Sequence, residues 1–220
     1  MKIQKTLLVL ALFAAPLLGC ETADDNKIEG ARACVDVAAK RSATDAAAAA
    51  VMATSCEAIV SGMTSAEANR IGFGAVLLMS QKFSQIPNLV TALQRSSSAV
   101  ATSLTFLTFT NTTSDSNYIK MATYSARSNS AGIQKVFLFF QSANVLAKIA
   151  GASSFADAAA VQTAVAALNP ANANNPNSDE AALASSLLSL QQTSCSGSGA
   201  TTSNCTKLTQ AIGSNTGSPA

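Results

Sequence analysis

The cysteines are the residues of this chain whose type and spacing are best suited to chemistry. Five are present, and the chain has no histidine. A thiol can form a disulfide, hold a metal or accept a covalent modification. The lack of histidine excludes Ser-His-Asp and Cys-His catalytic arrangements and histidine-based zinc sites. No Cys-x-x-Cys occurs, so we expect no metal site, and disulfides and modification remain.

Cys20 follows a segment that is typical of an export signal. Lys2 and Lys5 are the only charges before it, and Thr6–Gly19 is an uncharged, mostly apolar run. A charged start followed by a short apolar run is the pattern of a secretory signal. The run is too short to span a bilayer core, which needs about 20 apolar residues.

The end of this run, Leu17-Leu18-Gly19-Cys20, resembles the lipobox of bacterial lipoproteins. The resemblance implies that residues 1–19 are removed, and that the Cys20 thiol receives a diacylglycerol and the new amino group an acyl chain. Several acyl chains on one residue anchor a protein stably to a membrane. By the same resemblance Glu21, which stands where Asp would favour the inner membrane, points to the outer membrane. The alternative is an ordinary secretory signal with a chance cysteine.

The other four cysteines are Cys34, Cys56, Cys195 and Cys205. An even number in an exported protein suggests disulfides, and four cysteines allow three pairings. We favour the two local pairs, Cys34–Cys56 and Cys195–Cys205. Free thiols remain an alternative for the first pair.

Other catalytic signatures are missing from the sequence. It contains no Ser-x-x-Lys and no glycine-rich phosphate loop. The carboxylate pairs Asp24-Asp25 and Asp179-Glu180 fall in a polar stretch and in the expected first turn of a helix, where a solvated structural role is favoured. We therefore expect no enzymatic activity and no cofactor.

The densest aromatic patch contains Phe137, Phe139 and Phe140. Its plainest interpretation is the core face of a helix. The alternative is that part of it lines a groove for an apolar ligand or a partner helix.

Charge excludes further classes of partner. Removing Lys2 and Lys5 from the 14 Lys and Arg leaves 12, which equals the 12 Asp and Glu. We expect no binding to nucleic acid, because there is no basic field to hold phosphates. The membrane is expected to be contacted through the lipid anchor rather than through a basic patch.

Periodicity and capping residues predict a chain of helices separated by short loops. We expect a lipidated tether over 20–26, an all-helical domain over 27–213 and a flexible tail over 214–220. The expected N-caps include Ser42 or Thr44, Ser114 or Ser116, Ser130, and Ser154. Within the domain we expect helices over about 27–40, 44–61, 65–84, 88–96, 116–128, 131–150, 155–168 and 178–193, a loop over 169–177, and a last short helix near 213. Residues 99–113 fit a helix or a strand, and we favour the helix because a strand there would have no partner.

The stretch from Cys56 to Leu78 is similar to one join of a tetratricopeptide-type helical repeat. Cys56-Glu57-Ala58-Ile59-Val60 would end one helix, and Ser65-Ala66-Glu67-Ala68-Asn69-Arg70-Ile71-Gly72 would begin the next. The aromatic residues usual in that family are missing, and no second copy follows at its period of about 34 residues. The resemblance therefore implies helix–turn–helix stacking, and the peptide-binding role of the family does not carry over.

Together these patterns predict a single all-α domain of about seven to nine helices, packed as an irregular bundle or hairpin array. They favour a lipid-anchored, non-catalytic adaptor or structural protein of the cell envelope, with an envelope protein as its partner. The alternative is a periplasmic binding module for a lipid or another apolar ligand.

Overall fold

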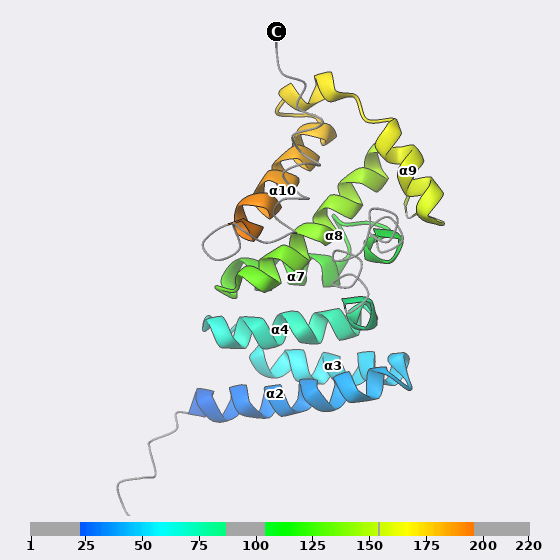
Figure 1. Cartoon of the computed structure of the whole chain (residues 1–220). Helices are drawn as coiled ribbons and strands as arrows, with labels where there is room; N and C mark the ends of the chain where they lie inside the picture. Colours follow the sequence, from blue (N-terminus) through cyan, green and yellow to red (C-terminus); the bar gives the residue numbers. More distant parts are fainter. Residues whose placement is uncertain (1–22, 87–103, 154, 196–220) are drawn as a thin grey trace, which may run out of the picture.

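The computed structural model describes residues 23–86, 104–153 and 155–195. Helices α2, α3, α4 and α7 are stacked on one another, and α8 leads away from α7 towards α9 and α10 (Figure 1). No strand occurs in these three ranges, and the predicted all-α single domain is confirmed. The elements are α2 (Ala23–Ser42), α3 (Ala46–Val60), α4 (Ala66–Met79), η1 (Phe83–Gln85), α7 (Ser116–Arg127), α8 (Ala131–Ile149), α9 (Ala158–Ala166), η2 (Pro170–Asn174) and α10 (Asp179–Ser194).

Helix α2 begins earlier than the sequence analysis predicts. It starts at Ala23, so the expected tether over 20–26 is too long by four residues. Asp24 and Asp25 lie in its first turn, where negative charge is favourable next to the N-terminal end of the helix dipole. Lys27 pairs with Asp24 across that turn at 3.6 Å. The two aspartates that were interpreted as part of a polar tether therefore start the helix.

Helices α2 and α3 form the predicted antiparallel hairpin. Asp45 caps α3, its carboxylate accepting the Ala48 amide at 2.9 Å, so the prediction of Ser42 or Thr44 as the cap is wrong. A carboxylate fills this position well because it accepts a hydrogen bond and also complements the helix dipole. The hairpin packs on α4 through a cluster of small and medium side chains: Ala38, Ala53, Cys56, Ala75 and Leu78.

Helix α4 starts at Ala66, one residue after the predicted start at 65. Ser65 is its N-cap and accepts the Ala68 amide at 3.2 Å. Glu67, in the first turn of α4, forms an ion pair with Arg32 of α2. The Glu67 side chain therefore links α4 to α2.

Helix α4 also ends earlier than the predicted 84. The Lys82 amide donates to the Leu77 carbonyl and the Gln81 amide to the Leu78 carbonyl, both at 2.9 Å. This is the Schellman arrangement, which needs a left-handed residue, and Gln81 supplies it with φ of 56°. Glycine usually holds that position, so the stop has no obvious sequence signal.

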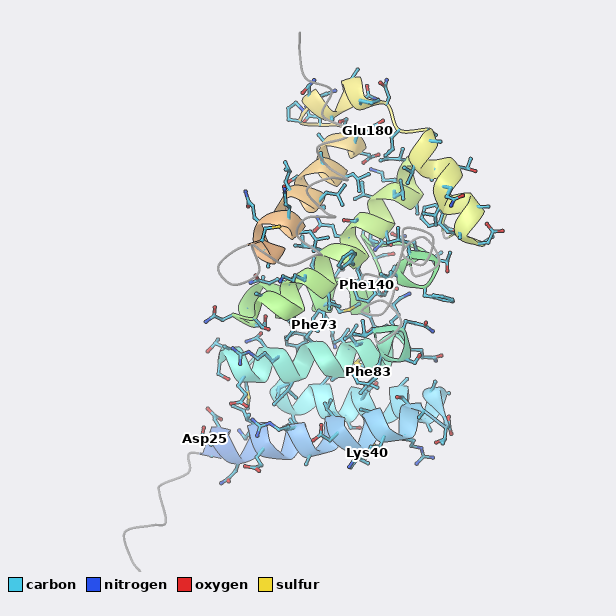
Figure 2. The ribbon with its side chains drawn as sticks, viewed as in Figure 1. Asp25, Lys40, Phe73, Phe83, Phe140 and Glu180 are labelled. Carbon is cyan, nitrogen blue, oxygen red and sulfur yellow. A yellow bond between two sulfur atoms is a disulfide. The ribbon has the colours of Figure 1, made fainter. Side chains whose placement is uncertain are left out.

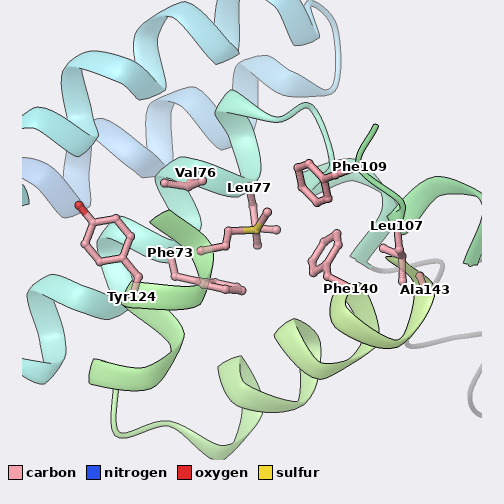
Figure 3. Close-up of a cluster of buried hydrophobic side chains, with 9 residues drawn as sticks. Phe73, Val76, Leu77, Leu107, Phe109, Tyr124, Phe140 and Ala143 are labelled. Atoms are coloured by element: carbon pink, nitrogen blue, oxygen red, sulfur yellow. The ribbon is translucent and has the colours of Figure 1, made fainter. Parts of the chain in front are cut away.

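The largest core cluster lies between α4, α7 and α8 (Figure 3). Phe140 of α8 and Met121 of α7 are fully buried there. Gly72 of α4 allows α7 to approach closely, because a Cβ at this position would lie 2.6 Å from Tyr124 Cε1. A second cluster joins α8 to α9 and α10: Leu146, Ala147, Phe155, Val161, Ala164 and Leu183.

The predicted caps of the later helices are right in one place and wrong in two. Ser130 caps α8 as expected, and Ser178, where the last long helix is predicted to start, caps α10. Asp115 caps α7 in place of Ser114 or Ser116, and Asp157 caps α9 in place of Ser154. At the start of α7 and of α9, as at Asp45, an aspartate suits the N-cap position because its carboxylate accepts a hydrogen bond and complements the helix dipole.

Two ambiguous stretches are partly described. Residues 104–107 are helical, in line with the preference for helix over strand, and 108–113 are not. The loop predicted over 169–177 contains the short 3-10 helix η2, which has Pro170 in its first turn. The predictions for residues 88–96, 214–220 and the helix near 213 lie outside the described ranges.

Candidate functional site

The predicted Cys34–Cys56 disulfide is present. It joins α2 to α3, with the two Cα atoms 5.5 Å apart. The two cysteines lie at similar distances from the hairpin turn, which is why their spacing predicts the bond. The bridge makes α2 and α3 one covalently closed hairpin.

The remaining cysteines are only partly described. Cys195 follows α10 and is disulfide-bonded. Cys205, its predicted partner, and Cys20, the predicted lipidation site, lie outside the described ranges. The Cys195–Cys205 pairing and the lipid on Cys20 therefore stay predictions.

The aromatic patch of α8 packs into the core. Phe140 is fully buried, and Phe137 and Phe139 are half-buried against the same cluster. The Phe137 ring lies 5.5 Å from that of Tyr118, and the Phe140 ring 5.8 Å from that of Phe109. These contacts support the core interpretation of the patch over a ligand groove.

A buried carboxylate connects α3 to α7. Glu57 is only 4% exposed. Its Oε1 accepts the Tyr124 hydroxyl at 2.5 Å, and its Oε2 accepts Lys120 Nζ at 2.8 Å. The ring of Tyr124 belongs to the core cluster, while its hydroxyl points away from Phe140 and the other rings (Figure 3).

This arrangement holds Tyr124 in its neutral form. Burial raises the pKa of Tyr124, and so does its hydrogen bond to the Glu57 carboxylate. Both oxygens of the buried carboxylate have partners, as a buried charge requires. We interpret the Glu57 network as a lock between α3 and α7 rather than as acid–base machinery.

Lys82 forms a second polar cluster just after α4. Its Nζ donates to the carbonyls of Phe106 and Thr108, both at 2.8 Å, and lies 4.4 Å from the centre of the Phe109 ring. Burial lowers the pKa of Lys82, and the nearby Asp115 carboxylate opposes that shift. The ammonium ties the segment at 106–109 to the end of α4.

An open hollow of about 360 Å³ adjoins Lys82. Gln81, Thr108, Thr110, Asp115 and Asn117 contribute polar side chains to its wall. The Asp115 carboxylate accepts the amides of Asn117 and Tyr118 as the cap of α7, so it already has a structural task. This hollow is not an enclosed apolar chamber of the kind that holds a lipid.

The outward face of α3 carries no charged side chain. Glu57 is the one charged residue of this 15-residue helix, and it points inward. Ala47, Val51, Thr54 and Ala58 are all exposed. Their spacing of four, three and four residues puts them in a single stripe. Val51 is 74% exposed.

Neither this stripe nor the Glu57 network is among the features predicted from the sequence. A signal for both was present, because residues 46–60 carry a single charge among alanines and other uncharged residues. A helical wheel of this segment puts Ala49, Ala53, Cys56 and Val60 on one face and the stripe opposite. The former are the residues that the structure buries.

Two kinds of feature are absent from the described ranges. They contain no cluster of three or more potential metal ligands. They also contain no helix that is long and apolar enough to cross a bilayer.

Comparison with protein families, characterised proteins and solved structures finds no match to this chain.

Proposed function

We propose that this chain is a lipid-anchored protein of the bacterial cell envelope that binds a partner protein without catalysing a reaction. The lipobox resemblance at Leu17–Cys20 supports the anchor, and Glu21 supports the outer membrane as its location. The observation that carries the binding role is the outward stripe of α3.

The stripe has the chemistry of a helix–helix contact. Small side chains at Ala47, Thr54 and Ala58 allow another backbone to approach closely, and Val51 supplies apolar area. The Thr54 hydroxyl donates to the Ala50 carbonyl at 3.2 Å, which reduces its polarity towards a partner. The partner that fits is an apolar helix face with no charge along its centre.

The disulfide favours this role because it stiffens the hairpin that presents the stripe. Cys34, near the middle of α2, and Cys56, in the last third of α3, fix the two helices against each other. A surface that is already ordered loses less conformational freedom when it binds. The hairpin therefore presents a preformed face.

The alternative is a binding module for a lipid or another apolar ligand, and we rank it second. The aromatic residues suggested for a groove pack in the core. The hollow beside Lys82 is open and edged by amide, hydroxyl and carboxylate groups.

Matched substitutions test the proposal. Val51→Lys puts a charge on the stripe, and Val165→Lys does the same on α9, where the side chain is also exposed, at 49%. We expect membrane extracts to yield a partner that co-purifies with the wild type and with Val165→Lys, and that is lost with Val51→Lys. Equal recovery with both variants would exclude the stripe as the binding face.

A photo-crosslinking residue at position 51 identifies the partner directly, with position 165 as the control. A crosslinked protein specific to position 51 supports the adaptor role. A small molecule held by the purified protein, together with no crosslink at position 51, would favour the ligand-binding alternative.

A further inference from the structure

We infer that the bilayer lies against one defined end of the helical body, made of the first turn of α2 and the two turns at 61–65 and 128–130. We call this the anchor end. The inference rests on the proposed lipid on Cys20 and specifies which surface of the protein then meets the lipid headgroups.

The reach of the chain is the first step. Only residues 21 and 22 separate Cys20 from Ala23, where α2 begins. Consecutive Cα atoms are 3.8 Å apart, so Cα of Ala23 lies at most about 11 Å from Cα of Cys20. An anchor this short keeps the start of α2 at the headgroup layer.

Contacts between the helices show what else lies at that end. Ile28 of α2 and Met63 of the 61–65 turn pack against one small cluster, which contains Ala31 and Val60. Arg32 pairs with Glu67 at the start of α4. These contacts put the 61–65 turn beside the first turns of α2.

The third part of the anchor end is held by Arg70 of α4. Its Nε donates to the Ser128 carbonyl at 2.9 Å, and its Nη2 donates to the Asn129 carbonyl at 3.3 Å. The turn between α7 and α8 is thereby fixed next to the start of α4. In Figure 1 the starts of α2, α4 and α8 all lie on the left side of the view.

The residues of the anchor end can contact lipid headgroups, but they would not bind the protein to a membrane without the lipid on Cys20. Its exposed turn residues are small and uncharged, among them Ser61, Thr64 and Asn129. Lys27 in the second turn of α2 is paired with Asp24, and Arg32 with Glu67. Arg70 and Arg127 add positive charge beside the turns, but fewer than the roughly four to eight clustered Lys and Arg that hold a protein to anionic lipid.

The alternative orientation would lay α2 and α3 flat on the membrane. Helices that lie in the interface carry Lys and Arg beside bulky apolar residues. The outward stripe of α3 has no Lys or Arg. The exposed charges of α2 are of both signs and cancel: Asp24, Asp25, Glu29 and Asp36 against Lys27, Arg32, Lys40 and Arg41. The end-on orientation also leaves the stripe open to a partner.

The two orientations predict different distances from the membrane. Asp25 and Lys40 mark the two ends of α2 (Figure 2), and a helix of 20 residues is about 30 Å long. End-on, the 61–65 turn lies at the headgroups and the α2–α3 turn near Thr44 lies roughly a helix length away. Flat, the two turns are at similar heights.

Short-range quenching by spin-labelled headgroups measures this difference. The mature lipidated protein is reconstituted into phosphatidylcholine vesicles that contain phosphatidylcholine with a headgroup nitroxide. A fluorophore is attached through a non-natural residue at Ser61 or at Thr44, which leaves the cysteines unchanged. We expect quenching at position 61 to be several-fold stronger than at position 44.

The tether itself supplies the control. Inserting 20 Gly and Ser residues between Cys20 and Ala23 leaves the lipid in place but gives the body a coil whose average span is roughly 25 Å. Quenching at position 61 should then fall towards the value at position 44. Unchanged quenching at position 61 would show that the short connection between Cys20 and α2 is not what holds the anchor end at the membrane.

The outcomes separate the inference from the proposed function. Equal quenching at both positions, or none at either, in protein that floats with the vesicles overturns the orientation and leaves the anchor intact. Failure of the purified mature protein to float with vesicles overturns the anchor itself, and the orientation with it.

Discussion

Glu57 is a buried, hydrogen-bonded residue whose loss should weaken the fold. Replacing it with Ala leaves the Tyr124 hydroxyl buried without its acceptor, so we expect a loss of about 2 kcal/mol in the free energy of unfolding. Lys120→Ala takes the partner from Oε2 of the buried Glu57 carboxylate, so we expect a comparable loss, on the order of 2 kcal/mol. Urea unfolding followed by circular dichroism measures both. Losses under about 0.5 kcal/mol in both variants would contradict a lock centred on the buried carboxylate.

The two tyrosines of the chain give a pH prediction. Burial raises the pKa of both Tyr118 and Tyr124 above 10.0, so the folded protein holds their protons where the unfolded chain releases them. Stability contributed by these neutral side chains is complete below the unfolded pKa and is lost as the pH rises above it. In rapid alkaline titration, tyrosinate absorbance of the folded protein should rise at higher pH than it does for the unfolded chain, with Tyr124 the last to ionise.

Tyr124→Phe is the control for that titration. It removes the residue whose pKa is raised both by burial and by the Glu57 hydrogen bond. The loss of stability between neutral and alkaline pH should be smaller in this variant than in the wild type. If both tyrosines of the folded wild type titrate at the ordinary tyrosine pKa, their side chains are solvated and the prediction is wrong.

Gly72 and Gly74 of α4 offer a matched test of helix packing. Alanine favours a helix over glycine by up to about 1 kcal/mol. At position 72 the new Cβ would meet Tyr124 Cε1 at 2.6 Å, and that ring is held in place by Glu57 and the core. We expect Gly72→Ala to destabilise the protein by about 1–2 kcal/mol.

At position 74 the same substitution has room. A new Cβ would meet Val35 Cγ1 at 3.6 Å, which is an ordinary contact. Gly74→Ala should therefore raise the free energy of unfolding by about 0.5–1 kcal/mol. A stabilised Gly72→Ala would mean that α7 does not cross α4 as closely as described.

The ends of the helices show what the sequence can and cannot predict at the scale of an element. Helix α8 ends close to the predicted residue 150, because Gly151 follows with φ of 65° and glycine adopts the left-handed conformation freely. Gln81 does the same work for α4, with φ of 56°, and no local pattern marks it. The stop is set by packing beyond the helix, where Lys82 reaches the carbonyls of Phe106 and Thr108.

At the scale of the molecule, the sequence is sufficient for the all-α class and for the Cys34–Cys56 pair. Both follow from local periodicity and from the symmetry of a hairpin about its turn. The way the helices pack against one another cannot be predicted from the sequence, because the alanine-rich faces of α2 and α3 have similar residue patterns. The Glu57 network joins residues 63 and 67 positions apart, and such a contact has no local signature.

The account depends most on the lipid at Cys20, because the anchor end and the membrane location both require it. Mass spectrometry of the N-terminal peptide of protein extracted from bacterial membranes tests it directly. We predict a peptide that begins at Cys20 and carries a diacylglyceryl group and an amide-linked acyl chain. A peptide that begins elsewhere, or an unmodified Cys20 in protein that still fractionates with membranes, would contradict the account.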